Sequence, residues 1–209
     1  MTKLLAIDVG NTNVKYGLFV DGKLTKTWRH ATDKTNVLAA KYLAKSDAPC
    51  AMACVVPAAG DVLRKVAGSR LICEVNAAAQ KWLTGMAPEM GADRVADAVA
   101  DWVLHAGSKT PTVVLSFGTA STLLAIDQNG HVIGGWIAPG ISTQLEAMHE
   151  RCALLPLLRM DKPSTALGFD TETHMSNGVF VANIGIASQW IKTASSNFAV
   201  PPVSVATGG

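Results

Sequence analysis

The sequence lacks the features that mark a membrane protein or a nucleic-acid-binding protein. No apolar run reaches the about 18–20 residues that a helix needs to cross a bilayer, and the N-terminus leads directly into a strand-like segment without a signal peptide. No stretch of five or more basic residues occurs, and the formal net charge is only +2. We therefore expect a cytoplasmic protein that binds neither a membrane nor nucleic acid.

Cysteines and charged residues are also few. The four cysteines lack the paired C-x-x-C spacing of a zinc site and lie among apolar residues, so we expect buried, reduced thiols at Cys50, Cys54, Cys73 and Cys152. Hydrophobic residues make up 49% of the chain and charged residues 16%, which is typical of a folded globular protein. A chain of 209 residues can form one large domain or two small ones.

Two stretches share a strand, a glycine turn and a second strand. They read IDVGNTNV at residues 7–14 and LSFGTAST at residues 115–122. An offset of 108 residues aligns the turn glycines, the next hairpin signals and the residues that precede the turns: Gly10 with Gly118, Asp21-Gly22 with Asn129-Gly130, and Asp8 with Ser116. Two ordinary hairpins would not share so many positions in one register, so we interpret them as an internal duplication.

Strands and helices alternate after each hairpin. Apolar periodicity and turn signals predict strands over 50–56, 70–75, 131–137 and 203–206, and helices over 36–45, 59–67, 92–106, 141–155 and 170–197. This order predicts an α/β fold of two βββαβα-type halves, residues 1–110 and 111–209. The second half lacks a strand and a closing helix, so we expect a truncated or shortened chain.

The glycine turns are suited to bind phosphate groups. Glycine has no Cβ, so backbone N–H groups at Gly10-Asn11-Thr12 can approach an anion closely. Asp8 is placed to hold Mg²⁺, directly or through water, and Lys15 can supply positive charge across the hairpin. A turn aspartate and a surface lysine are the structural alternatives. A second turn at Gly118-Thr119 favours phosphate binding between the two halves, although neither turn is a Walker loop or a GxGxxG loop.

Acidic residues recur at the start of the predicted helix 92–106. The helix macrodipole favours the ionised form of Asp93 in the first turn, where it can accept a proton. The spacing of Asp93, Asp97 and Asp101 by four residues is equally typical of one solvated helix face. Periodicity alone therefore favours a surface role for all three acids.

Taken together, these stretches resemble the type III pantothenate kinases of the actin, sugar kinase and heat-shock chaperone superfamily. The resemblance extends along nearly the whole chain and is carried by IDVGNTNVKYG at 7–17, MGADR at 90–94, SFGTAST at 116–122, GGWIAPG at 134–140 and TGG at 207–209. It implies two ribonuclease-H-like halves with an interdomain cleft. It also implies phosphorylation of the primary hydroxyl of pantothenate by ATP with Mg²⁺, the first step of coenzyme A biosynthesis.

The resemblance also implies roles for individual residues. Asp93 would be the general base, and Arg94 would pair with the pantothenate carboxylate through its planar fork. Gly91, Ala92 and Thr171 would also contact pantothenate, and the second subunit of a homodimer would complete the site. Thr171 follows Asp170, so helix capping is an alternative for it. Residues around the two turns would hold the ATP phosphates: Asp8, Val9, Gly10, Asn11, Thr12, Asn13, Val14, Lys15, Gly118 and Thr119. Asp97 and Asp101 are left as surface acids.

Two positions depart from the family pattern. Ser116 stands where most members carry an aspartate taken to bind a monovalent cation, K⁺ or NH₄⁺, and a hydroxyl brings no charge. We therefore expect this cation site to be lost, weakened or replaced. Gly85 stands in place of a tyrosine that walls the pantothenate pocket. The alternatives to a pantothenate kinase are a non-enzymatic regulator or accessory factor of the same fold and another small-molecule kinase of the superfamily.

Overall fold

The computed structural model describes residues 1–107 and 109–208, which group into two compact units. The first unit contains Met1–Lys81 and Met86–Val99, and the second contains Trp82–Gly85 and the described chain from Ala100 onward. Helix α3 (Ala92–Leu104) begins in the first unit and ends in the second. The predicted boundary between two repeated halves at residue 110 stays a prediction. It was drawn from the sequence repeat, whereas the two units are defined by compactness.

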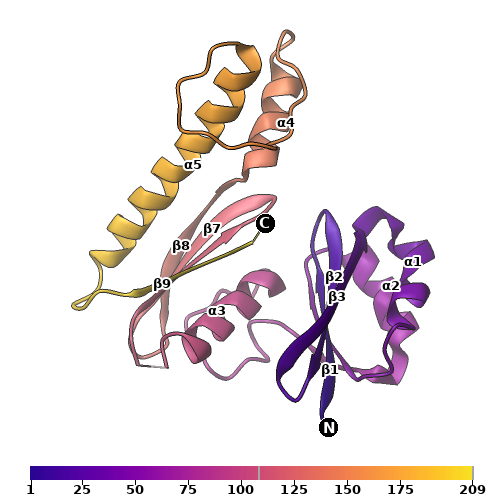
Figure 1. Ribbon diagram of the computed structural model, residues 1–209. Coiled ribbons are helices and arrows are strands. Elements are labelled where there is room, and N and C mark those ends of the chain that lie inside the picture. Colours follow the sequence, from indigo (N-terminus) through magenta and orange to yellow (C-terminus); the bar gives the residue numbers. More distant parts are fainter. Residues whose placement is uncertain (108, 209) are drawn as a thin grey trace. The chain divides into compact units, whose positions relative to one another are not determined.

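The first unit is built on a mixed sheet with strand order β3-β2-β1-β4-β5. These strands are β1 (Lys3–Val9), β2 (Asn13–Val20), β3 (Lys23–Ala31), β4 (Cys50–Cys54) and β5 (Leu71–Glu74). Strands β1, β2 and β3 are antiparallel neighbours, whereas β4 is parallel to β1 and β5 is parallel to β4. Figure 1 shows α1 (Thr35–Leu43) and α2 (Pro57–Ala67) lying together beside this sheet. The 3₁₀ turns η1 (Thr32–Lys34) and η2 (Gly68–Arg70) adjoin these helices.

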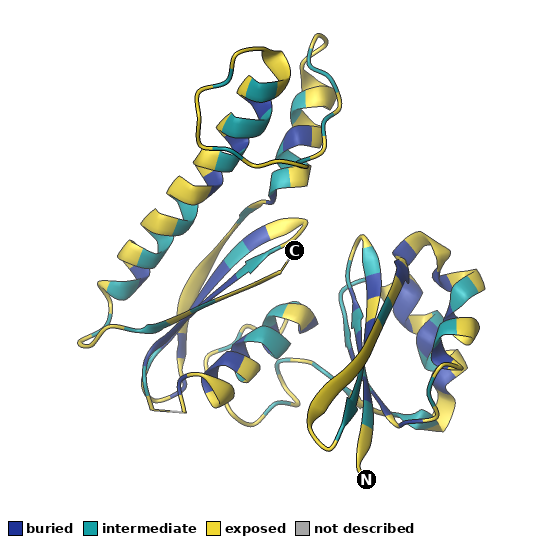
Figure 2. Ribbon diagram, in the orientation of Figure 1, coloured by how far each residue is buried: buried dark blue, intermediate teal, exposed yellow. Residues whose placement is uncertain are grey.

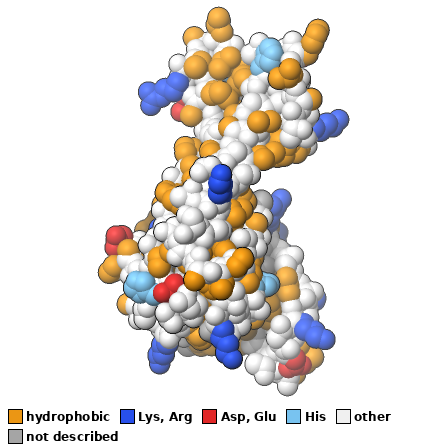
Figure 3. Space-filling model, turned by 90° about the vertical axis from the view of Figure 1, so that its left-hand side faces the viewer, with side chains coloured by type: hydrophobic (Ala, Val, Ile, Leu, Met, Phe, Trp, Pro, Cys, Tyr) orange, Lys and Arg blue, Asp and Glu red, His pale blue; other side chains and the backbone are white. Residues whose placement is uncertain are grey.

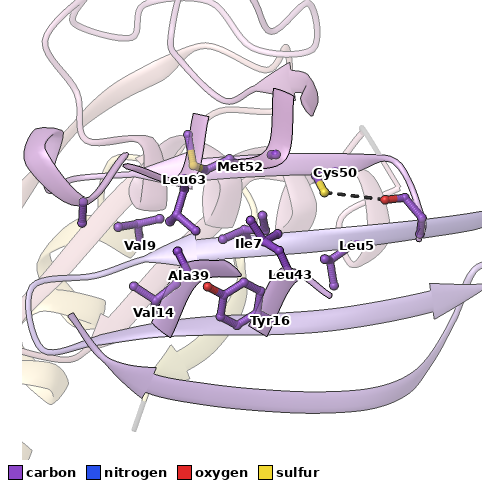
Figure 4. Packing of buried hydrophobic residues seen from close by; sticks show 13 residues of the cluster. Leu5, Ile7, Val9, Val14, Tyr16, Ala39, Leu43, Cys50, Met52 and Leu63 are labelled. Atoms are coloured by element: carbon purple, nitrogen blue, oxygen red, sulfur yellow. Dashed lines mark hydrogen bonds between the residues drawn. The ribbon is translucent and has the colours of Figure 1, made fainter. Parts of the chain in front are cut away.

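Alternation along β1 decides which side chains enter the core of the first unit. Leu5, Ile7 and Val9 are buried, whereas the residues between them point to the other face of the sheet. Figure 4 shows these three side chains meeting Leu63 of α2 and Leu43 of α1. Burial of each such side chain is worth about 1.5–3 kcal/mol. Both helices are thereby fixed over one face of the sheet.

The second unit repeats this plan with strand order β8-β7-β6-β9. The strands are β6 (Thr112–Phe117), β7 (Ala120–Ile126), β8 (Val132–Pro139) and β9 (Val203–Gly208). The first three are antiparallel neighbours and β9 is parallel to β6, as β4 is to β1. Gly22 and Gly130 have matching left-handed φ values of 77° and 76° in the second turn of each repeat. The shared order, directions and turn confirm the predicted duplication.

Two helices follow β8. Helix α4 (Ile141–Arg151) is shorter than the predicted helix over 141–155. The backbone of its C-cap residue, Cys152, is already extended, so the helix ends before Pro156 could end it. Helix α5 (Thr171–Ser195) begins with a capping box between Asp170 and Thr173. Figure 2 shows buried residues on only part of the α5 surface. Within the described residues, no helix is long and apolar enough to cross a membrane.

The four cysteines are free, as expected, but their burial differs from the prediction. Cys50 is buried and Cys54 is partly buried, whereas Cys73 and Cys152 are exposed. Cys73 lies on the edge strand β5, whose neighbour covers only one side. Cys152 lies at the end of α4. The prediction of burial was therefore wrong for these two, since an apolar local sequence also occurs at sheet edges and helix ends.

A hydrogen-bonded pair of side chains, Tyr16 and His30, is buried among aromatic rings at the edge of the hydrophobic core of the first unit. The Tyr16 hydroxyl and His30 Nε2 lie 3.0 Å apart, and His30 Nδ1 lies 2.9 Å from the carbonyl oxygen of the next residue. A carbonyl only accepts, so Nδ1 carries the hydrogen and Nε2 accepts from Tyr16. Trp28 stacks on Tyr16, and Lys45 lies over the Tyr42 ring. Burial raises the pKa of Tyr16, so its phenol stays a hydrogen-bond donor.

Replacing Tyr16→Phe should destabilise the first unit. The change removes the phenol that donates to a buried imidazole nitrogen, and such a loss costs about 1–3 kcal/mol. Urea unfolding at neutral pH measures the difference. Tyr42→Phe is the matched control, because Tyr42 meets its neighbours through its ring, and its effect should stay within about 0.5 kcal/mol. Equal stability of the two variants would contradict the assigned hydrogen bond.

Candidate active site

The carboxyl end of β1 places a carboxylate and an ammonium group on the open face of the first sheet. Asp8 pairs with Lys15 in the antiparallel register, and its Oδ2 lies 4.0 Å from Lys15 Nζ. Both side chains are about half exposed, at 47% and 49%. An exposed pair at this distance adds little stability, so both groups stay accessible to a ligand.

The second predicted acid is near the first. Val55, directly after β4, donates its backbone N–H to the Val9 carbonyl, and Gly91 packs against Val55. Asp93, two residues after Gly91, acts electrostatically on Asp8. The structure thus brings both predicted acids to the carboxyl ends of the parallel strands β1 and β4, the edge at which open α/β sheets bind ligands.

The start of α3 fixes the Asp93 carboxylate. Its Oδ1 accepts the backbone N–H of Arg94 at 2.7 Å. A Cβ on Gly91 would lie about 2.7 Å from the same oxygen, so a larger residue there would displace the carboxylate. Asp93 remains exposed, and Arg94 is partly buried. A helix N-terminus with an accessible carboxylate suits proton acceptance.

The environment of Asp8 favours its neutral form. Burial raises the pKa of Asp8 and is the largest effect, the positive charge of Lys15 opposes it, and the negative charge of Asp93 adds to it. The binding of Mg²⁺ at Asp8 stays a prediction.

An open cavity of about 740 Å³ adjoins these groups within the first unit. Asp8 and Lys15 line it, together with Ala96 of α3 and small residues of β1 and β4 that include Ala6 and Ala53. These strand residues lie on the face opposite α1 and α2. The cavity thus offers a charged end beside an apolar floor, which is typical of small-molecule sites.

The first glycine turn is held from inside by the residue that follows β3. Thr32 Oγ1 donates to the Gly10 carbonyl at 2.7 Å, and Thr32 N–H donates to the Thr12 carbonyl at 3.0 Å. The Gly10 N–H donates to the Asn13 carbonyl. Asn11 and Thr12 form the exposed tip of the turn. Three carbonyl oxygens of the turn are thereby satisfied by the protein.

The second glycine turn is held in a related way. The Thr119 carbonyl accepts from Thr143 Oγ1 at 2.7 Å and from Gly140 N–H at 2.9 Å. A Cβ on Gly140 would overlap the Gly118 carbonyl oxygen, so only glycine allows this close approach. The second turn is one residue shorter than the first. Three residues lie between the paired strand residues Phe117 and Ser121, whereas four lie between the pair Val9 and Val14.

Ser116 lies in a row of hydroxyl side chains. It pairs with Thr122 of β7 and with Thr207 of β9. Directly paired residues point to the same face of a sheet, so this position offers neutral oxygen atoms in place of the Asp8 carboxylate of the first repeat. Within the described residues, no group of three or more His, Cys, Asp or Glu side chains is arranged to hold a metal ion.

Two further positions singled out in the sequence have defined local structure, and a third lies outside the described residues. Thr171 is the first residue of α5, directly after the capping residue Asp170, and it is exposed. Gly85 has a φ of 75°, and a Cβ there would overlap the His131 ring. No bulky residue fits Gly85 in this conformation. Gly209, the last residue of the TGG stretch, lies outside the described residues.

Asp101 corrects one prediction. It is only 7% exposed, its Oδ1 lies 3.7 Å from His105 Nε2, and its Oδ2 has no hydrogen-bond partner in the described part of the chain. Burial raises the pKa of Asp101, and His105 opposes this effect. The prediction that Asp101 is a surface acid was wrong. The buried side of α3 shifts around the helix from its first half to its second half, so Asp101 lies on the buried side.

Sequence reasoning missed the residues that hold the turns. Thr32, Gly140 and Thr143 lie outside both glycine stretches, so nothing marked them when the turns were considered alone. The offset of 108 was a usable signal, because it pairs Thr35 with Thr143 and Thr32 with Gly140. Extending the repeat alignment past the third strand would have singled out these positions.

Comparison with known proteins first defines the class of fold. Over 100% of this chain and 85% of the other, the structure is similar to MreB5 of Spiroplasma citri bound to ADP, with a TM-score of 0.51 and 9% identity. It is also similar to a Baf family transcriptional activator from Campylobacter jejuni, with a TM-score of 0.59 and 19% identity over 98% of this chain and 90% of that one. These two similarities show that the chain has the α/β fold of both proteins.

The family is narrower than the fold. The model of the type III pantothenate kinase family matches residues 4–193. The chain is 33% identical over 225 residues to the type III pantothenate kinase of Roseiflexus sp. strain RS-1, covering 99% of this chain and 87% of that protein. The chain belongs to the type III pantothenate kinase family, and the resemblance in the sequence is confirmed.

Asp8→Asn should not destabilise the protein at neutral pH. Because the folded-state pKa of Asp8 is raised above 3.8, ionisation of this carboxyl group costs stability, and the cost grows as the pH rises from 3.8 through the raised pKa. The variant should therefore unfold at the same temperature as the wild type or a higher one at pH 7.5. The difference should shrink as the pH falls below 3.8, where the carboxyl group is protonated in the folded and the unfolded chain alike. Thermal unfolding across this pH range measures the effect.

Asp127→Asn is the control of opposite sign. Burial raises the pKa of Asp127, but the backbone N–H groups of His131 and Asn129 outweigh it and lower the pKa overall. This variant should lose stability at pH 7.5, and the loss should shrink as the pH falls toward 3. The same trend for both variants would contradict the assigned environments.

Proposed function

We propose that this protein transfers the γ-phosphoryl group of ATP to the primary hydroxyl of pantothenate, the first step of coenzyme A biosynthesis. The observation that carries the proposal is the approach of Asp93 to Asp8 at the carboxyl ends of β1 and β4, in a chain of this family. Both acids are accessible, and a glycine turn adjoins Asp8 directly. Since the reaction consumes ATP, we place it in the cytoplasm.

Asp93 is the proposed general base. The pantothenate hydroxyl oxygen attacks the γ-phosphorus, the bond to the β–γ bridging oxygen breaks, and the hydroxyl proton passes to the Asp93 carboxylate. In such a loose transition state the base mainly orients the nucleophile and takes its proton late. The fixed position of Oδ1 on the Arg94 N–H leaves Oδ2 to accept that proton.

The groups at the end of β1 are proposed to bind the ATP phosphates. The Asn11 N–H at the exposed tip of the turn faces the phosphates, since the Gly10 N–H already donates to the Asn13 carbonyl, and Lys15 neutralises the phosphate charge. The Gly118-Thr119 turn of the second unit contributes in the same way. Asp8, aided by bound water, fits Mg²⁺, which needs only one or two carboxylates beside nucleotide phosphates. Mg²⁺ held by Asp8 would supply positive charge that offsets the negative charge developing on the phosphates.

Pantothenate is proposed to bind through its carboxylate to Arg94. A planar guanidinium binds two carboxylate oxygens at once, and Gly91 and Ala92 let the ligand approach the start of α3. Thr171 completes the site from the second subunit of a homodimer. Exposed apolar residues between the end of α4 and the start of α5 support an interface: Leu154, Leu157, Leu167 and Phe169. Figure 3 shows hydrophobic side chains gathered over the upper part of the molecule, where α4 and α5 lie.

Asp93→Asn should abolish most turnover without unfolding the protein. The amide keeps the shape of the carboxylate but cannot accept the proton, so kcat should fall about 10²–10⁴-fold. A coupled assay with pantothenate, ATP and Mg²⁺ measures the loss. Asp97→Asn is the matched control, one helical turn further along α3, and should change kcat less than about twofold.

The wild type should be a dimer by light scattering.

The same assay separates the alternatives. A non-enzymatic regulator of this fold, which Ser116 and Gly85 favour, predicts no turnover from dimeric wild-type protein. Another small-molecule kinase predicts ATP consumption with a different alcohol and none with pantothenate. Equal turnover of wild type and Asp93→Asn would remove the general base from the mechanism.

Ser116→Asp tests the proposed monovalent-cation site. The wild type offers only hydroxyl oxygens in this row, so we expect weak or no activation by K⁺ or NH₄⁺. A carboxylate supplies the charge that a bound cation needs, so the variant should gain at least a threefold stimulation by K⁺ over Na⁺. Ser116→Ala should stay unresponsive. An identical K⁺ response in all three proteins would exclude this residue from cation binding.

A further inference from the structure

Each glycine turn is held by a threonine hydroxyl from the segment after the third strand of its own sheet. In the first unit, Thr32 follows β3 and donates to the Gly10 carbonyl at 2.7 Å. In the second unit, Thr143 lies in the first turn of α4, after β8, and donates to the Thr119 carbonyl at 2.7 Å. In both units the threonine that makes this contact lies outside the glycine turn itself.

Thr32 is itself fixed by its surroundings. It is 8% exposed, and its carbonyl accepts from Thr35 Oγ1 at 2.7 Å, where Thr35 begins α1 and is 2% exposed. Its backbone N–H also donates to the Thr12 carbonyl. The turn is therefore connected through Thr32 to the helix that packs on the hydrophobic core.

Holding a carbonyl also aims the N–H of the same peptide group. The C=O and N–H of a trans peptide point in opposite directions. Because the Gly10 carbonyl faces Thr32, the Asn11 N–H faces away from Thr32, and within residues 1–107 and 109–208 it has no hydrogen-bond partner. In the second unit, Thr143 and Gly140 hold the Thr119 carbonyl in the same fashion.

An anion gains most from donors that are already oriented. A turn that must rotate its peptide groups on binding spends binding free energy on that ordering. Without the threonine hydroxyl, the Gly10 carbonyl could turn outward and face the phosphate oxygens. This orientation would be repulsive, since both groups are acceptors.

We propose that Thr32 and Thr143 are positioning residues that orient the two turns for the phosphates of the nucleotide. Neither hydroxyl touches the ligand, because each is occupied by a backbone carbonyl. This inference rests on the proposed binding of ATP at the two turns. The inference adds that the affinity for the nucleotide depends on the hydroxyl groups of Thr32 and Thr143, whereas the affinity for pantothenate does not.

Thr32→Val tests the inference. Valine keeps the shape of threonine and the backbone N–H bond to Thr12 but loses the hydroxyl. The dissociation constant for ATP, measured by calorimetry on the full chain with Mg²⁺, should rise about 5–20-fold, while KM for pantothenate stays within about twofold. Thr32→Ser restores the hydroxyl and should restore ATP affinity. A purely structural role would instead lower stability and leave the ATP dissociation constant unchanged.

Thr25→Val is the matched control. Thr25 Oγ1 donates to the Leu18 carbonyl at 2.9 Å at the opposite end of the same β2–β3 hairpin, so the variant loses an equivalent bond away from the turn. Its ATP affinity should equal that of the wild type. Should Thr32→Val fail to fold, Thr143→Val and Thr143→Ser provide the same comparison in the second unit.

The outcomes separate this inference from the proposed function. If the wild type binds ATP and phosphorylates pantothenate but both valine variants bind ATP as tightly as the wild type, the positioning role is wrong and the kinase remains. Equal weakening by Thr25→Val would also overturn it, since location at the turn would then be irrelevant. If the wild type binds no ATP, the proposed function fails first, and the positioning role fails with it.

Discussion

The two-residue period of β1 is the constraint from which the candidate site follows. Ile7 and Val9 face the core under α1 and α2, so Asp8 between them must face the open side of the sheet. The antiparallel register with β2 then sets Lys15 beside it. A slip of one residue would bury the carboxylate and expose two large aliphatic side chains. The same burial that stabilises the first unit thus also orients its charged groups.

Duplication explains why the two turns look alike, and divergence explains why they differ. Both repeats keep the strand order and the left-handed glycine. In each a threonine after the third strand holds a turn carbonyl, although Thr32 and Thr143 are not equivalent positions of the repeat. The carboxylate survives in one repeat only, at Asp8, while the equivalent residue is Ser116. Both repeats therefore offer a backbone turn, whereas only the first repeat offers a carboxylate at this strand position.

Much of the fold was predictable because its signals are local. Alternation, the Asp21-Gly22 turn and the position of Pro57 at the first turn of α2 are all visible in the sequence. The burial of Asp101 was not predictable, because it depends on which side of α3 is covered by residues distant in the chain. The electrostatic effect of Asp93 on Asp8 has the same origin, since 85 positions separate the two residues and Gly91, near Asp93, packs on Val55 at the end of β4.

The close approach of Gly140 to the second turn also restricts how this protein can change over evolutionary time. Any side chain at Gly140 would collide with the Gly118 carbonyl, so that position tolerates no drift while the turn keeps its shape. Ser116, by contrast, is a strand residue paired with Thr122 and Thr207, and exchange of its side chain does not require the turn to change shape. Descendants of this sequence can therefore vary at Ser116 more readily than at Gly140.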